Sequence, residues 1–197
     1  MFRIITAEDV HPMNEARLIK NITDQIKEAQ IKLGYAEETL RFYYPVSSLN
    51  VILGTACEDE NTMIAELRDN SRFRNTVLGE FTFTVRSGRI EVSVMPQGAE
   101  YVYKKVEDPP FLVDIINLFK ENHHCGIEDI KEIFGRYSND YVCEKMQEGM
   151  EFDYVMHFKD TEIDEYYYCI KAEMGHTVYH RFSKEDYQQL FKQNGIT

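Results

Sequence analysis

The sequence contains no tryptophan, no long apolar run, and no run of more than two adjacent basic residues. A membrane-spanning helix needs about 20 apolar residues, so we do not expect an integral membrane protein. The formal net charge of −12 disfavours nucleic acid and anionic lipid as partners, because both carry dense negative charge. We therefore expect a partner of another kind.

Cysteine is also scarce, with four residues and no C-x-x-C pair. The N-terminal residues become acidic by Glu8 and Asp9 and lack the apolar core of an export signal. We therefore expect a cytoplasmic protein, in which cysteines remain reduced thiols. The thiols concerned are Cys57, Cys125, Cys143 and Cys169.

Apolar residues are plentiful, and they predict an ordered core. Of the 197 residues, 43% are hydrophobic and 13% are aromatic, which is unlike a disordered chain. A chain of this length fits one large domain or two small lobes. Pro109-Pro110 is the candidate boundary, giving an N-terminal lobe over 1–108 and a C-terminal lobe over 109–197. One compact domain is the alternative.

The clearest local pattern lies in the N-terminal lobe. Apolar and polar residues alternate over 81–86 and again over 90–94, with Ser87-Gly88 between them. A two-residue loop ending in Gly predicts a tight hairpin, in which Val85 lies opposite Ile90. The apolar side chains of both strands then share one face of the hairpin.

Spacing and capping signals predict the remaining elements of an α+β fold. The N-terminal lobe also has predicted helices over 14–33, 47–53 and 60–70 and extended pieces over 39–44 and 100–106. Asn14 is the predicted cap of the first helix and Gly34 its stop, and Ser47 or Ser48 is the predicted cap of the second. In the C-terminal lobe, two helices precede a four-stranded antiparallel meander, and a helix with Ser183 as its predicted cap follows it. These elements cover 111–121, 127–137, 141–146, 152–159, 165–172, 176–182 and 184–193. About five to six helices pack with the two antiparallel sheets.

Short connections fix the register of the meander and divide its side chains between two faces. Cys169 lies opposite Val155 on one side and His180 on the other, and His157 lies opposite Tyr167. One face, with Tyr168 and Ile170, is apolar and should meet the helices. The other face mixes polar groups with valines. Its candidate ligand-binding residues are Glu144, Asp153, His157, Tyr167, Cys169 and His180.

This polar face has two interpretations. Cys169, His180 and His157 could form a metal or acid–base site, because opposed strand residues lie about 5 Å apart. An ordinary exposed sheet face is the simpler interpretation, since no local motif supports the ligands. His123, His124 and Cys125 are weak metal candidates for a similar reason: adjacent side chains rarely point at one centre, and a polar loop between helices explains them.

No catalytic motif is present, and we predict no cofactor. The acids over 160–165 lack the glycine and the closing glutamate of a Ca²⁺ loop, so a solvated turn is expected there. The helices over 111–137 and the strands that follow resemble a winged helix. The helix over 127–136 carries three acids against two bases, however, which opposes insertion into DNA.

Four stretches resemble an uncharacterised family of cytoplasmic proteins from gut-type Gram-positive anaerobic bacteria, known as a domain of unknown function. The stretches are KLGYAEETLRFYYPVSSLN (32–50), VMPQGAEYVY (94–103), VCEKMQEGMEFDYVMHFKD (142–160) and DEYYYCIKAEMGHTVYHRF (164–182). The resemblance implies a bacterial, cytoplasmic setting. It implies no activity, cofactor or site residue.

Together these observations favour a non-catalytic α+β protein that binds a partner protein or a small molecule. The alternative is a metal-dependent or acid–base enzyme that uses the polar face of the C-terminal sheet. Nucleic-acid binding through a winged-helix-like element is a weaker alternative. The catalytic residues of an enzyme are not identified, and the sequence leaves open whether identical chains associate.

Overall fold

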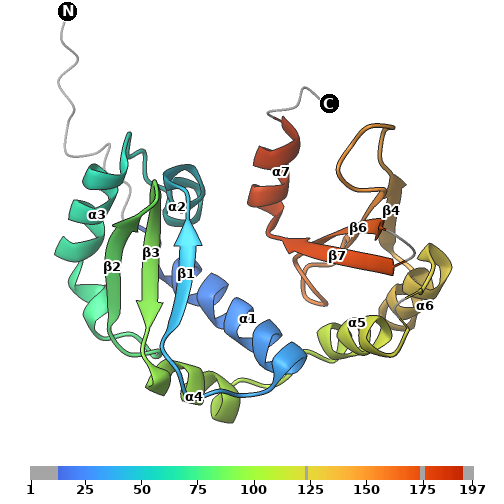
Figure 1. The fold of residues 1–197 in the computed structure, drawn as a ribbon, viewed down its shortest axis with the longest axis horizontal. Helices are drawn as coiled ribbons and strands as arrows, with labels where there is room; N and C mark the ends of the chain where they lie inside the picture. Colours follow the sequence, from blue (N-terminus) through green and yellow to red (C-terminus); the bar gives the residue numbers. More distant parts are fainter. Residues whose placement is uncertain (1–12, 123, 174–175, 193–197) are drawn as a thin grey trace, which may run out of the picture. The chain divides into compact units, whose positions relative to one another are not determined.

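The computed structural model describes residues 13–122, 124–173 and 176–192, and it confirms the α+β class (Figure 1). The described residues form seven α-helices, more than the five to six expected, one short 3-10 helix and two antiparallel sheets. In chain order these elements are α1 (Glu15–Leu33), β1 (Leu40–Tyr44), α2 (Val46–Leu53), α3 (Glu60–Asp69), η1 (Ser71–Arg74), β2 (Phe81–Arg86), β3 (Arg89–Val94), α4 (Pro96–Lys105), α5 (Pro110–Glu121), α6 (Ile127–Tyr137), β4 (Tyr141–Lys145), β5 (Tyr154–Phe158), β6 (Tyr167–Glu173), β7 (His176–Phe182) and α7 (Lys184–Lys192).

The chain divides into two compact units, residues 1–107 and 108–197. The first unit holds the three-stranded sheet, in the order β1-β3-β2. The hairpin register is confirmed, because Val85 pairs with Ile90 and Phe83 pairs with Val92. Both turn residues, Ser87 and Gly88, have positive φ, as the two-residue turns that match strand twist require.

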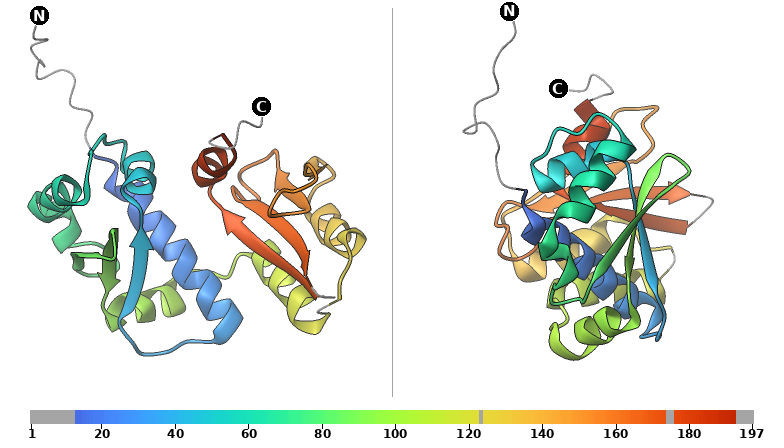
Figure 2. Two further views of the ribbon diagram at one scale, coloured as in Figure 1. Left: turned by 45° about the horizontal axis from the view of Figure 1, so that its top comes forward. Right: turned by 90° about the vertical axis from the view of Figure 1, so that its left-hand side faces the viewer.

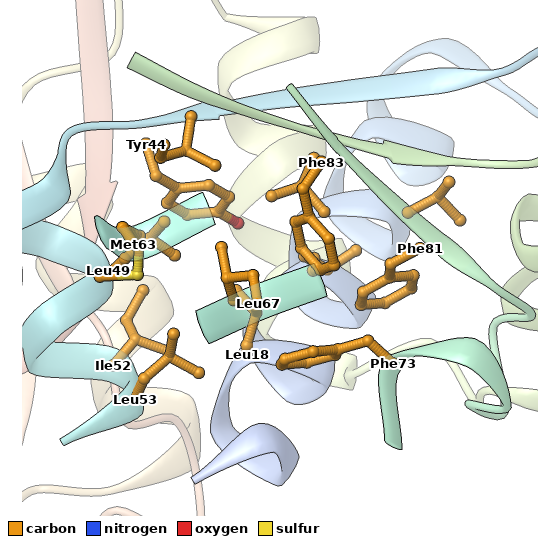
Figure 3. Packing of buried hydrophobic residues seen from close by; sticks show 14 of the residues in the cluster. Leu18, Tyr44, Leu49, Ile52, Leu53, Met63, Leu67, Phe73, Phe81 and Phe83 are labelled. Carbon is orange, nitrogen blue, oxygen red and sulfur yellow. The ribbon is translucent and has the colours of Figure 1, made fainter. Parts of the chain in front are cut away.

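Helices α1, α2 and α3 cover one face of this sheet and form the core of the first unit (Figures 2 and 3). Spacing in the sequence predicts one apolar stripe from Leu18 to Leu33. The structure buries Leu18, Ile22 and Ile26 completely, but Ala29 and Leu33 at the end of the stripe are exposed, so that part of the prediction is wrong. The predicted ends of α1 are confirmed: the Asn14 side chain accepts from the Arg17 amide, and Gly34 ends the helix with positive φ. Burial of an apolar stripe stabilises a helix far more than its intrinsic propensity does.

Two local predictions for the first unit are wrong. Residues 100–105, expected to be extended, belong to helix α4, which begins at Pro96. Ala99 and Val102 are both buried and lie three residues apart, so they share one face of a helix. The second error concerns α2, which begins at Val46 after Pro45 rather than with a serine cap at Ser47 or Ser48.

The second unit contains the four-stranded meander, in the order β4-β5-β6-β7. Its predicted register is confirmed, because Cys169 pairs with both Val155 and His180. The apolar face meets α5 and α6 as expected. Tyr168 and Ile170 are at most 3% exposed, and the ring of Phe111 from α5 lies 5.4 Å from that of Tyr168.

The prediction that the acids over 160–165 form a solvated turn is wrong for Asp164, because the Asp164 side chain is buried. Its carboxylate accepts the Tyr166 amide at 2.8 Å and the Tyr168 hydroxyl at 3.1 Å. The guanidinium of Arg181, from β7, lies 3.5 Å from the same carboxylate and 3.6 Å from the centre of the Tyr166 ring. The acids at this turn therefore include one that joins the turn to the sheet.

Candidate functional site

The polar face of the meander carries the six residues predicted to bind a ligand, but the structure fills its centre. Helix α7 and the segment 146–152 cover it, and Phe152 and Phe191 pack with Val155 and Cys169. Ser183 begins α7 as predicted, since its hydroxyl accepts the Asp186 amide at 3.1 Å. The centre of this face is therefore a second, small hydrophobic core.

Cys169 lies in that core and is fully buried. Burial raises the pKa of its thiol to about 12, because a thiolate would lose its hydration there. A nucleophile or a metal ligand needs the thiolate form. The surroundings of Cys169 therefore suit packing better than chemistry.

His157 and Tyr167 come together at one end of this face. Their rings stack with centroids 4.1 Å apart, and Tyr167 also stacks on Tyr187 of α7 at 4.6 Å. Burial raises the pKa of Tyr187 to about 12, and the nearby Cys169 and the Glu144 carboxylate add to that shift. Burial, with Glu144, also raises the pKa of Tyr167. This stack holds α7 against the sheet.

The other three predicted residues are not members of that stack. Glu144 is exposed on β4, and His180 is exposed on β7 with its ring 5.3 Å from that of Phe152. Asp153 has a structural bond, because its carboxylate accepts the Ala172 amide of β6 at 2.7 Å. Sequence reasoning thus predicted the face correctly but not its covering.

A hollow of about 430 Å³ borders the covered face. None of the six predicted residues lines it, so the structure does not gather them around a cavity. Its walls come from the loop after β4 and from α7. The lining residues are Gln147, Glu148, Gly149, Met150, Glu151, Leu190 and Phe191.

The weak metal candidates lie on the loop between α5 and α6. His123 is outside the described residues, His124 is exposed with its ring stacked on His176 at 5.2 Å, and Cys125 is buried. Burial raises the pKa of the Cys125 thiol. In the described part of the chain, no three His, Cys, Asp or Glu side chains lie close enough to hold a metal ion.

A groove of about 530 Å³ lies in the first unit, along strand β2, and sequence reasoning missed it. Residues of α3 and η1 form one wall, and β2 forms the other. Leu67, Phe73, Phe81 and Phe83 form its floor and are at most 4% exposed, since they belong to the core and point toward one another there (Figure 3). The rings of Phe73 and Phe83 lie 5.2 Å apart. The polar lining residues are Arg68, Asn70, Arg74, Glu80, Thr82 and Thr84.

Among the residues that the structure describes, β2 is an edge of its sheet and has β3 as its one neighbouring strand. Arg86 and Arg89 flank the two-residue turn and form a hydrogen-bonded pair of the ladder. Every second residue of β2 counted from Arg86, namely Thr84 and Thr82, therefore also directs its backbone groups toward β3. The backbone groups of Phe81, Phe83 and Val85 then point outward. Arg68 donates to the Phe83 carbonyl at 2.8 Å. Among the described residues, the outward groups of Phe81 and Val85 have no hydrogen-bond partner.

A family comparison covers nearly the whole chain. Residues 15–191 match the family model described as "Domain of unknown function, E. rectale Gene description (DUF3877)". The chain belongs to this family. The predicted resemblance is therefore confirmed, and the bacterium named in the description suggests a bacterial origin. Comparison of the chain with curated proteins and with solved structures gave no match.

The family description names no activity. No helix in the described ranges combines the length and the apolar character that a membrane crossing requires.

Proposed function

We propose that this chain is a non-catalytic binding protein that takes up an extended peptide segment of a partner protein as an added strand on β2. The open edge of β2 carries this proposal. An edge strand presents a row of backbone donors and acceptors that another chain can pair with. The outward groups of Phe81 and Val85 are such donors and acceptors.

The groove beside β2 supplies what backbone pairing lacks, which is selectivity for side chains. In strand addition, main-chain hydrogen bonds provide affinity, and pockets for alternate side chains provide specificity. Side chains that face the groove would meet its exposed polar lining, including Arg68 and Arg74, because Phe73 and Leu67 are buried beneath it. Those on the opposite side of the sheet would lie beside Thr82 and Thr84. Thr82 and Thr84 are exposed on the sheet face away from the helices.

Fewer observations support the alternative of an enzyme that uses the polar face of the meander. Cys169 and the centre of its face lie beneath Phe152 and Phe191, and the stack of His157 on Tyr167 joins α7 to the sheet. The nucleic-acid alternative depends on α6, whose acids Glu128, Asp129 and Glu132 oppose a phosphate backbone. We therefore favour the peptide-binding edge.

Selection of short random peptides displayed on phage against the full chain tests the proposal. Proline at Val85 removes an outward amide without touching the ladder to β3, so V85P should lose the selected peptides. The matched control V85T keeps that amide and should retain them. Far-UV circular dichroism and cooperative melting check that both variants fold.

N-methylation of the selected peptide gives a second readout that does not depend on a variant's fold. In an added strand, every second peptide amide faces β2 and the amides between them point away. Methyl groups on the amides that face β2 should abolish binding, whereas methyl groups on the amides between them should leave it unchanged. Failure to enrich any peptide would overturn the proposal. The proposal would also be overturned if the peptide bound equally to V85P and V85T and if both sets of N-methylated peptides bound alike.

A further inference from the structure

We infer that the peptide taken up by β2 is acidic, with carboxylates that pair with Arg68 and Arg74. This inference rests on the function proposed above and deepens it. Both arginines line the groove and are exposed. Arginine binds a carboxylate through two parallel hydrogen bonds, so a pair of arginines beside a strand edge favours acidic side chains.

Among the described residues, Arg68 and Arg74 have no carboxylate partner, which they share with Arg89 but not with Arg41, Arg72 or Arg86. Arg41 and Arg86 both pair with Glu91, and Arg72 pairs with Glu15 at 2.9 Å. For Arg68 and Arg74, no carboxylate oxygen of the described residues lies within 4.0 Å. Their charges are thus available to a ligand.

Backbone contacts hold both guanidinium groups at the groove. Arg68 donates to the Phe83 carbonyl at 2.8 Å, and Arg74 donates to the Arg68 carbonyl at 3.4 Å. The groove also contains Glu80, so its lining carries two positive charges and one negative charge. Positioned donors lose less conformational entropy on binding than free ones do.

The distribution of charge along the chain opposes an acidic ligand less in the first unit than in the second. Residues 1–107 hold 13 basic and 16 acidic residues, whereas residues 108–197 hold 9 and 18. Eight of the ten arginines lie in the first range. The groove therefore lies in the less acidic unit.

A second copy of this chain is a poorer occupant of the same edge. Two β2 edges that paired antiparallel would place the Arg68 and Arg74 side chains of both copies along one interface. Like charges across an interface disfavour association. An acidic segment of a different protein has no such penalty, so we take it as the occupant.

The peptides enriched by display provide the probe. Asp and Glu should be enriched over the input library, and replacing both acids of the best binder by Gln should weaken binding about tenfold. The same loss should appear with R74E and the acidic peptide. R136E, an equal charge change at an exposed arginine of α6, should leave binding unchanged. Raised salt should weaken the acidic peptide more than its Gln form.

A charge swap separates a direct pairing from a general field effect. A peptide with Lys in place of one Glu should bind R74E better than it binds the unaltered chain. Binding that depends on Val85 but is unaffected by Glu-to-Gln exchange would overturn the acidic inference and leave strand addition standing. Concentration-dependent self-association that V85P abolishes, measured by sedimentation, would identify a second copy as occupant and overturn it as well.

Discussion

Asp164 and Arg181 form a buried ion pair in which both side chains are less than a tenth exposed. Removing one partner of a buried pair leaves the other charge without compensation in a medium of low polarity. Asp164→Ala should therefore lower the free energy of unfolding by about 3–5 kcal/mol, measured by urea denaturation. Asp140→Ala breaks the exposed pair with Lys159 and should cost at most about 1 kcal/mol. Equal losses for the two variants would contradict the assigned role of the buried pair.

The buried carboxyl group of Glu15 links the stability of the fold to pH. Burial opposes its charge, but hydrogen bonds from Asn70 at 2.6 Å and Arg72 at 2.9 Å outweigh burial, and the pKa of its carboxyl is lowered. A lowered pKa in the folded state means that stability is present above the unfolded value of 4.5 and is lost as pH falls through the folded value.

Glu15→Gln removes this proton-linked contribution and leaves the other carboxylates unchanged. Between about pH 5 and pH 3, the melting temperature of the unaltered chain should fall more steeply than that of the variant. At neutral pH the variant should be less stable. Parallel melting curves across this pH range would show that Glu15 is not linked to folding.

Some of these residue contacts can be predicted from the sequence and others cannot. The pairing of Cys169 with His180 could be predicted, because short turns fix the register of neighbouring strands. The pairing of Asp164 with Arg181 could not, since a turn acid is usually solvated and its partner lies on another strand. The burial of Cys169 was missed because it depends on where α7 packs.

At the scale of elements, helix α4 shows how a local pattern can mislead. Tyr101, Val102 and Tyr103 suit a strand by composition, but Ala99 and Val102 are buried on one helical face. Gln30 of α1 donates to the Ala99 carbonyl at 2.8 Å, which joins the two helices. Tertiary packing therefore decides the conformation of this segment.

Gly98 in α4 gives a test of that packing. A Cβ atom there would lie 2.5 Å from both the Leu78 carbonyl oxygen and a Val94 methyl group. Gly98→Ala should therefore destabilise the chain by about 1–3 kcal/mol, although alanine favours helices. Gly135→Ala in α6 meets no atom within 4 Å and should stabilise by up to about 1 kcal/mol. Changes of the same sign in thermal melts would contradict the packing of α4.

At the scale of the whole molecule, the candidate site depends on sheet order. The alternation over β2 and β3 predicts the hairpin, but no local signal shows that β1 pairs with β3 rather than with β2. Because β1 pairs with β3, strand β2 remains an edge of the sheet beside α3 and η1. The arginines that line the groove are separated from β2 in sequence, so the groove could not be predicted without coordinates.

Amide hydrogen exchange along β2, followed by nuclear magnetic resonance, tests the central claim most directly. In the free chain, the amides of Phe81, Phe83 and Val85 should exchange faster than those of Thr82 and Thr84, which bond to β3. The selected peptide should slow exchange at Phe81, Phe83 and Val85 and leave Thr82 and Thr84 nearly unchanged. Uniform protection along β2 in the free chain, or no slowing with bound peptide, would contradict an open edge that accepts a strand.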